Sequence, residues 1–172
     1  GTVVLEDEQT RGLAMLNALD ATQRKQAIVS VSKTGNNNIS EAFKDNQVLD
    51  YAGIRATALN EAQRRQLIDL VGLFVSNMRE GHARVRMDEV RRDLDRTYFA
   101  WIGSPEGKVF YYRIHSPLIL IEFDHQVPVG LRHLSPMPTL PNPEHVHVVI
   151  RTPNGNDYGK DLLRQHYAQH PH

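Results

Sequence analysis

The stretch that decides the fold spans residues 109–124 and reads VFYYRIHSPLILIEFD. It holds two runs of β-branched and aromatic residues, separated by Ser116-Pro117. Such runs on either side of a turn are typical of two antiparallel strands. If the turn consists of that dipeptide alone, His115 lies opposite Leu118 and the strands pair outward from there. The stretch therefore predicts a β-hairpin in this register.

The two faces of this hairpin differ in polarity. Successive side chains of a strand point to opposite faces, so alternate positions share a face. One face carries only apolar and aromatic side chains: Phe110, Tyr112, Ile114, Ile119, Ile121 and Phe123. The other face carries mostly charged or polar side chains: Tyr111, Arg113, His115, Glu122 and Asp124. We expect helices to cover the first face, and we call the second the polar face.

Runs of the same composition on both sides of the hairpin predict further strands at 97–102 and 145–151. Alternation along the last strand assigns three of its residues to the polar face: His145, His147 and Arg151. Residues 128–143 contain five prolines, which exclude a regular central strand. We expect that segment to be a long loop.

The chain before residue 97 has helical periodicity, clearest over 60–78 and 83–95. Segments 19–28 and 59–68 resemble each other. Each has Asp or Asn followed three residues later by Gln, which is a variant of the capping box at a helix start. Between them, the polar run Gly-Asn-Asn-Asn at 35–38 is expected to be a mobile surface loop.

Together these patterns predict a single α+β domain over residues 1–172. In this arrangement N-terminal helices (1–96) pack on one face of a C-terminal antiparallel β-meander (97–152). A short helix, expected at 158–169, ends the chain. The length of 172 residues is within the usual size of one domain.

The composition argues against several classes of function. Lys and Arg number 20, and so do Asp and Glu, so no net charge attracts nucleic acid or an anionic membrane. The absence of cysteine excludes disulfides and Cys-type zinc sites, and is compatible with a soluble secreted or periplasmic protein. No apolar run approaches the roughly 18 residues of a membrane span. Glycine-rich phosphate loops and nucleophile elbows are also absent.

The main candidates for chemistry are His145 and His147, which a single valine separates. On one side of a strand two such imidazoles start about 7 Å apart, a spacing that suits two ligands of one metal ion. Glu122, or else Asp124, would add a third ligand and leave positions open, as in catalytic sites for zinc, iron or copper. The alternative is that both histidines lie on a solvated face and bind no metal.

Other residues of the polar face also have a functional and a structural interpretation. Glu122 and Asp124 could act as an acid and base pair, or they could form a cross-strand ion pair with Arg113. Tyr111 and Arg113 could hold a substrate carboxylate through the guanidinium fork, or they could be structural.

Further histidines lie in the C-terminal part of the chain. His166 and His170 are spaced i,i+4 on the expected last helix, where they could hold a metal or belong to a solvated chain end. His125 and His133 flank or occupy the proline-rich loop and could reach over the polar face.

Five blocks of sequence carry a resemblance to a known family. They read TYFAWIG at 97–103, FYYRI at 110–114, LIEFD at 120–124, HVHVVIR at 145–151 and NDYG at 156–159. In these blocks and their spacing the chain resembles the C-terminal half of the domain-of-unknown-function 3500 (DUF3500) family. The resemblance implies that a missing N-terminal half, or a separate chain, could complete any site. It implies no established activity, although its blocks coincide with the polar face.

Two functions from different classes are compatible with these observations. The first is a metal-dependent enzyme, a hydrolase or oxidoreductase, with a divalent zinc, iron or copper ion on His145, His147 and Glu122. The second is a non-enzymatic binding or scaffolding half whose polar face docks on a partner chain, on a missing N-terminal half or on another copy. A metal-free acid–base enzyme that uses Glu122 with His147 is a third possibility.

Overall fold

The computed structural model describes residues 3–40, 48–130, 133, 137–153 and 166–171. Its α-helices are α1 (Glu6–Asn17), α2 (Ala21–Ala27), α3 (Glu61–Val75) and α4 (Glu80–Arg92). Its strands are β1 (Ile28–Ser30), β2 (Ile54–Arg55), β3 (Tyr98–Ile102), β4 (Tyr111–His115), β5 (Leu120–His125) and β6 (Val146–Arg151). The predicted α+β class is confirmed. Within the described ranges, no helix has the length and apolar character that a membrane span requires.

The strands form one sheet in the order β1-β3-β4-β5-β6, and β2 also pairs with β3. From β3 to β6 each neighbouring pair is antiparallel, which confirms the predicted β-meander. The part expected to be helical, residues 1–96, also contains two short strands, β1 and β2, which extend the sheet. These strands have three and two residues, too few to show the alternation that identifies a strand. Of the helix expected at 158–169, only the end lies within the described residues, and residues 166–169 are helical.

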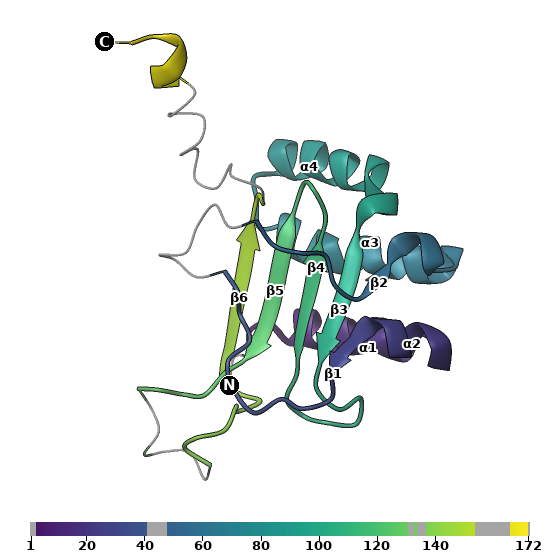
Figure 1. The fold of residues 1–172 in the computed structure, drawn as a ribbon, viewed down its shortest axis with the longest axis vertical. Coiled ribbons are helices and arrows are strands. Elements are labelled where there is room, and N and C mark those ends of the chain that lie inside the picture. Colours follow the sequence, from purple (N-terminus) through teal and green to yellow (C-terminus); the bar gives the residue numbers. More distant parts are fainter. Residues whose placement is uncertain (1–2, 41–47, 131–132, 134–136, 154–165, 172) are drawn as a thin grey trace.

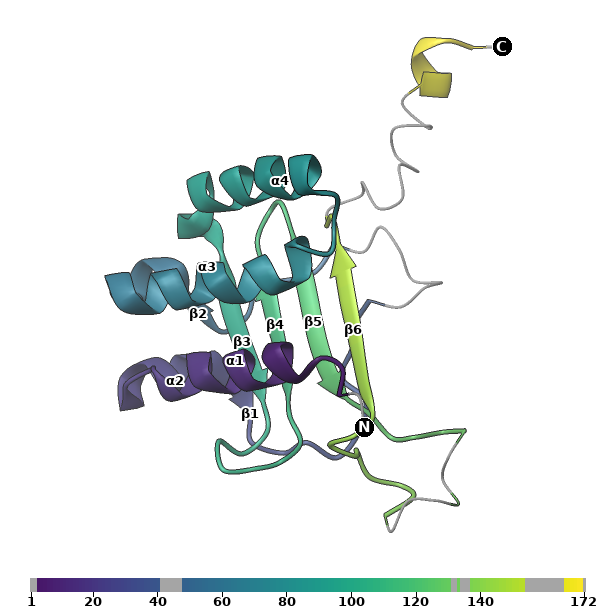
Figure 2. The same cartoon turned by 180° about the vertical axis from the view of Figure 1, so that it is seen from behind.

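The helices lie on one face of the sheet, as Figures 1 and 2 show from opposite sides. They cover the apolar face, where Trp101, Tyr112 and Phe123 are completely buried. Helix α1 lies close to the sheet at Gly12, where a Cβ atom would lie 2.3 Å from Cε1 of Tyr112. Burial of a large apolar side chain stabilises a fold by about 1.5–3 kcal/mol. This face therefore carries the hydrophobic core.

The two similar segments begin α2 and α3, and both predicted capping boxes are present. Backbone N–H groups of Gln23 and Gln63 donate to the Asp20 and Asn60 side chains at 2.8 and 2.9 Å. The Gln63 Nε2 atom also donates to Gln23 Oε1 at 2.7 Å. The repeat is therefore a pair of similarly capped helices whose first turns contact each other.

The hairpin of β4 and β5 has a longer turn than the sequence suggested. His115 pairs with Leu120, not Leu118, and the Ser116 N–H donates to the Ile119 carbonyl at 2.9 Å across the turn. The predicted register is therefore wrong by two residues. Because a shift by an even number of residues leaves each side chain on its face, the predicted division into an apolar and a polar face is confirmed.

Two described segments between β1 and β2, residues 33–40 and 50–51, lie on the polar face. Residues 33–40, which we call the strap, bond through their backbone to side chains of β5. Further along, the carbonyl of Asp50 contacts Arg113, and the Tyr51 ring lies on His115. The run 35–38, expected to be a surface loop, is thus part of a layer that contacts the sheet.

Candidate functional site

Glu122 lies in the middle of the polar face with 0 % of its surface exposed. Its Oε1 atom accepts hydrogen bonds from the Ile39 N–H at 2.8 Å and from the Tyr111 hydroxyl at 2.7 Å. Its Oε2 atom accepts from the Ser40 N–H at 2.9 Å. Both oxygens are therefore occupied by donors of the strap and of β4. Burial, reinforced by Glu122, raises the pKa of Tyr111 far above its ordinary value, which keeps this hydroxyl a donor.

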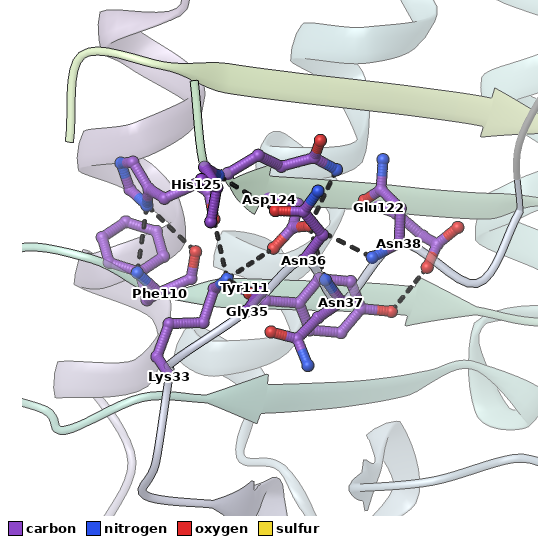
Figure 3. Close-up of polar contacts among 12 residues, drawn as sticks. Lys33, Gly35, Asn36, Asn37, Asn38, Phe110, Tyr111, Glu122, Asp124 and His125 are labelled. Atoms are coloured by element: carbon purple, nitrogen blue, oxygen red, sulfur yellow. Dashed lines mark hydrogen bonds and ion pairs between the residues drawn. The ribbon is translucent and has the colours of Figure 1, made fainter. Parts of the chain in front are cut away.

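Asp124, whose polar contacts Figure 3 shows, lies on the same face. It is also completely buried. The Oδ2 atom accepts from the backbone N–H groups of Asn37 and Asn38, at 2.7 and 3.1 Å, and from Gln126 Nε2 at 3.0 Å. The ammonium of Lys33 lies 3.1 Å from Oδ1. The aspartate is therefore held by three hydrogen bonds and one buried ion pair.

Lys33 connects the strap to the sheet. Besides Asp124, its Nζ atom donates to the carbonyl of His125 at 2.7 Å and to that of Gly35. Burial lowers the pKa of Lys33, and the charge and hydrogen bond of Asp124 oppose that effect. A buried ammonium is tolerated when it is paired and hydrogen-bonded in this way.

The sequence left two catalytic roles open for these carboxylates: an acid and base pair, or a third metal ligand supplied by Glu122 or else Asp124. In this arrangement their oxygens hold the strap, and either role would require the strap to release its N–H donors. Tyr111, predicted to face a substrate, donates to Glu122 instead. These catalytic assignments remain predictions, and what the geometry supports directly is a structural use of the two carboxylates.

Arg113 is the Cα partner of Glu122 across β4 and β5. The expected ion pair is nevertheless absent: no carboxylate of the described residues forms an ion pair with Arg113. Its guanidinium donates through Nη2 to the Asp50 carbonyl at 3.2 Å, and its Nε atom is buried without a partner. Both oxygens of Glu122 instead accept from strap N–H groups and from the Tyr111 hydroxyl.

His145 and His147 lie side by side at the β6 edge of the polar face. Their Nε2 atoms are 3.1 Å apart, and their ring centroids 4.9 Å. His147 pairs across the sheet with Asp124, which confirms that it lies on the polar face. His147 is exposed and His145 partly buried. Burial, together with the neighbouring His147, lowers the pKa of His145.

A third ligand for this pair is not in place. Among the residues that the structure describes, no group of three His, Asp or Glu side chains is arranged to hold a metal ion. Glu122 and Asp124 are on the same face but are turned toward the strap. The histidine pair is therefore assembled, while the three-ligand site expected from the sequence is not.

His125 has a different position from the one expected. Its place beside the proline-rich loop would have allowed it to reach over the polar face, but it faces the helices, because its Cα partner Val146 lies on the apolar face. Its Nε2 atom bonds with the Gln9 Oε1 atom at 3.0 Å, and its Nδ1 atom with the backbone of Phe110. Burial lowers the pKa of His125. It is a hydrogen-bonded histidine of the core.

Neither Lys33 nor the N–H groups of the strap were indicated by sequence patterns. Lys33 is 92 residues from His125, and Asn37 is 87 residues from Asp124. The only local signal was the run Gly-Asn-Asn-Asn, whose residue types favour turns that present several backbone N–H groups to an anion. That signal could have suggested an anion-binding segment, but not which carboxylates it binds.

Comparison with known proteins places the chain in a family without assigning it an activity. No curated protein and no solved structure matches it. The family described as "Protein of unknown function (DUF3500)" matches residues 1–160. The correspondence to the C-terminal half of longer members remains a prediction. Because the match covers most of the chain, this protein belongs to the DUF3500 family.

Proposed function

We propose that this chain is a metal-dependent enzyme, a hydrolase or an oxidoreductase, whose metal ion is bound by His145 and His147. The observation that carries the proposal is the distance of 3.1 Å between their Nε2 atoms. At metal–nitrogen bonds of about 2.0–2.1 Å, two imidazoles that occupy neighbouring positions of one ion have nitrogens about 2.9–3.4 Å apart. The pair therefore has the spacing of two ligands before any movement.

The position of the pair also supports this proposal. The two rings lie at the edge of the sheet, and His147 is exposed, so an ion and a small molecule can reach them. With two protein ligands, several positions of the ion remain open to water and substrate. A metal ion in such a site supplies an activated water or a redox centre.

The source of a third ligand distinguishes two versions of the proposal. To bind the metal, Glu122 would have to give up its hydrogen bonds from the strap N–H groups and from the Tyr111 hydroxyl. This requires the strap to move. A ligand from another chain, or from a missing N-terminal half, would leave Glu122 in place. The second version needs fewer changes in the described structure.

Metal content tests the proposal. Protein stripped with a chelator and reloaded separately with zinc, iron or copper should retain about one ion per chain, and the double variant His145→Ala/His147→Ala should retain none. The matched control is His166→Ala/His170→Ala, which removes the other adjacent histidine pair, with ring centroids 5.0 Å apart. We expect this control to bind as the wild type does.

Two results would contradict the proposal. One is a wild-type protein that retains no stoichiometric metal and gains no melting temperature with any of the three ions. The other is metal retention that depends on His166 and His170 but not on the proposed pair. If metal binds at the pair, screening the loaded protein with ester, amide and phosphate-ester substrates and with redox dyes then tests for catalysis.

A second candidate function is a binding or scaffolding role, with a partner on the β6 edge of the sheet. The observation in its favour is a cavity of about 270 Å³ lined in part by Phe74, Met78, Ile119 and Ile150. Met78 and Ile150 are 47 % and 43 % exposed there. The variant Ile150→Asp should then lower the solution mass, or abolish binding of a separately expressed N-terminal half, whereas Val85→Asp on α4 should do neither.

A further inference from the structure

Arg113 is a buried cation with few partners. It is 6 % exposed, and its Nε atom has no hydrogen-bond partner. Its Nη2 atom reaches only a neutral carbonyl, that of Asp50, at 3.2 Å. In the described part of the chain no carboxylate pairs with it. Burying a charge without a counter-charge destabilises a protein strongly, so a guanidinium left in this state is a group with unused binding capacity.

His115 lies two residues further along β4, on the same face. It is 1 % exposed, and neither ring nitrogen has a hydrogen-bond partner. Burial, and secondly the charge of Arg113, lower the pKa of His115 to about 4. The ring is therefore neutral at physiological pH and keeps one N–H to donate. Two neighbouring side chains thus leave donors unused on the same face of one strand.

Aromatic rings adjoin this pair. The Tyr51 ring lies with its centroid 4.4 Å from that of His115 and stacks on Tyr98 at 4.9 Å, with 17° between the planes. Tyr51 is 42 % exposed, so solvent reaches the ring that covers His115. Tyr51 is therefore a solvent-accessible part of the cover over His115.

We propose that Arg113 and His115 form the floor of a binding site for a small planar carboxylate, which enters beside Tyr51. The guanidinium donates two N–H groups to the carboxylate in the fork geometry, and His115 donates a third. The planar body of the ligand stacks on Tyr51. The site is independent of the metal proposed at His145 and His147.

The charge and the surroundings select the class of ligand. One guanidinium with a neutral histidine balances a single negative charge, which fits a carboxylate better than a doubly charged phosphate. The buried donors also disfavour a neutral analogue of the same shape, because an amide presents its own N–H groups to them. Aromatic stacking adds selectivity for a flat body over an aliphatic one.

Benzoate is the probe, tested on the chelator-stripped full chain at constant ionic strength. We expect it to raise the melting temperature and to shift the His115 ring resonances, assigned by their loss in His115→Gln. Benzamide, which has the same shape without the charge, should do neither. Acetate should bind more weakly than benzoate.

Three arginine variants sharpen the test. Arg113→Met should weaken benzoate binding at least about tenfold, and without ligand it should be no less stable than the wild type, because it removes an unpaired buried charge. Arg113→Lys keeps the charge but lacks the paired N–H groups of the guanidinium, so it should also weaken benzoate binding. This variant replaces Arg113→Met in the test if the Met variant does not fold. Arg91→Met, which removes an exposed arginine paired with Asp88, should bind as the wild type does.

Several outcomes would overturn the site. They are a wild-type protein whose His115 resonances do not respond to benzoate, an equal response in Arg113→Met, and equal binding of benzamide. Phosphate that competes as well as benzoate at matched ionic strength would overturn the assignment to carboxylates. Because the protein carries no metal in these experiments, none of these results depends on the histidine pair.

Discussion

The polar face holds two pairs of candidate functional side chains, which differ in burial and in hydrogen-bond partners. Glu122 and Asp124, at its centre, are completely buried and accept hydrogen bonds from the strap. His145 and His147, at its edge, are more exposed and contact each other. Buried charges require partners, so the carboxylates are part of what holds the fold together. The histidines contact each other and lie nearer to solvent, which makes them the better candidates for binding.

The largest effect should follow from breaking the central pair. Asp124→Ala leaves the ammonium of Lys33 buried without its counter-charge and removes the acceptor for two strap N–H groups. We expect a loss of about 3–5 kcal/mol in the free energy of unfolding, measured by urea denaturation.

The double variant Lys33→Met/Asp124→Leu is the control for that loss. It removes both charges at once, so it should recover a substantial part of the stability, although the N–H groups of Asn37 and Asn38 remain without an acceptor. A loss below about 1 kcal/mol in Asp124→Ala would mean that the ion pair is not a structural element.

A smaller loss is expected from Tyr111→Phe, which removes one donor from Glu122 and leaves the two strap N–H groups in place. Hydrogen bonds to charged groups contribute about 1.5–3 kcal/mol, and we expect a destabilisation in that range by urea denaturation. Tyr167→Phe, which changes an exposed tyrosine, is the matched control. Equal stability of Tyr111→Phe and wild type would show that the hydroxyl is replaceable by water and that the centre of the face is open.

His115 should make the stability of the protein depend on pH. Its pKa is about 4 in the fold, against 6.5 for an ordinary histidine, because of burial and of the Arg113 charge. Its contribution is fully present above pH 6.5 and is lost as the pH falls toward about 4, because only the unfolded chain binds the proton there. Protein interiors respond to a new charge with an effective dielectric well above that of dry protein, so we expect about 1–2 kcal/mol rather than the full value of the shift.

The measurement is the difference in unfolding free energy between wild type and His115→Gln from pH 7 to pH 4. The variant should lose less stability over this range. His125 also has a lowered pKa, but it is present in both proteins and cancels in the difference. Parallel pH profiles for the two proteins would contradict the assignment of this acid sensitivity to His115.

How far the sequence could predict this molecule depends on the range of the interactions involved. Strand alternation is local, so it assigned Tyr111, Glu122 and His147 to the correct face even though the hairpin register was wrong by two residues. Alternation cannot show what lies above a face. The strap reaches Asp124 from 87 residues away, and it does so with backbone N–H groups, which every residue type except proline carries. Within the described residues the predicted three-ligand site is not assembled, since the strap supplies the donors that occupy the carboxylates.

The smallest effect on stability, and the most informative one, concerns the edge pair. Without metal, His145→Ala/His147→Ala should change the unfolding free energy by no more than about 0.5 kcal/mol, because exposed side chains outside a network contribute little. With zinc at about 100 times its dissociation constant, the wild type should gain about 2.7 kcal/mol and the variant nothing, since only the folded pair binds. The first comparison separates the histidines from the structural carboxylates, and the second separates a metal site from two rings that merely share a hydrogen bond. A large loss in the metal-free variant would place the histidines with Glu122 and Asp124 as part of the fold, and the contrast between centre and edge would disappear.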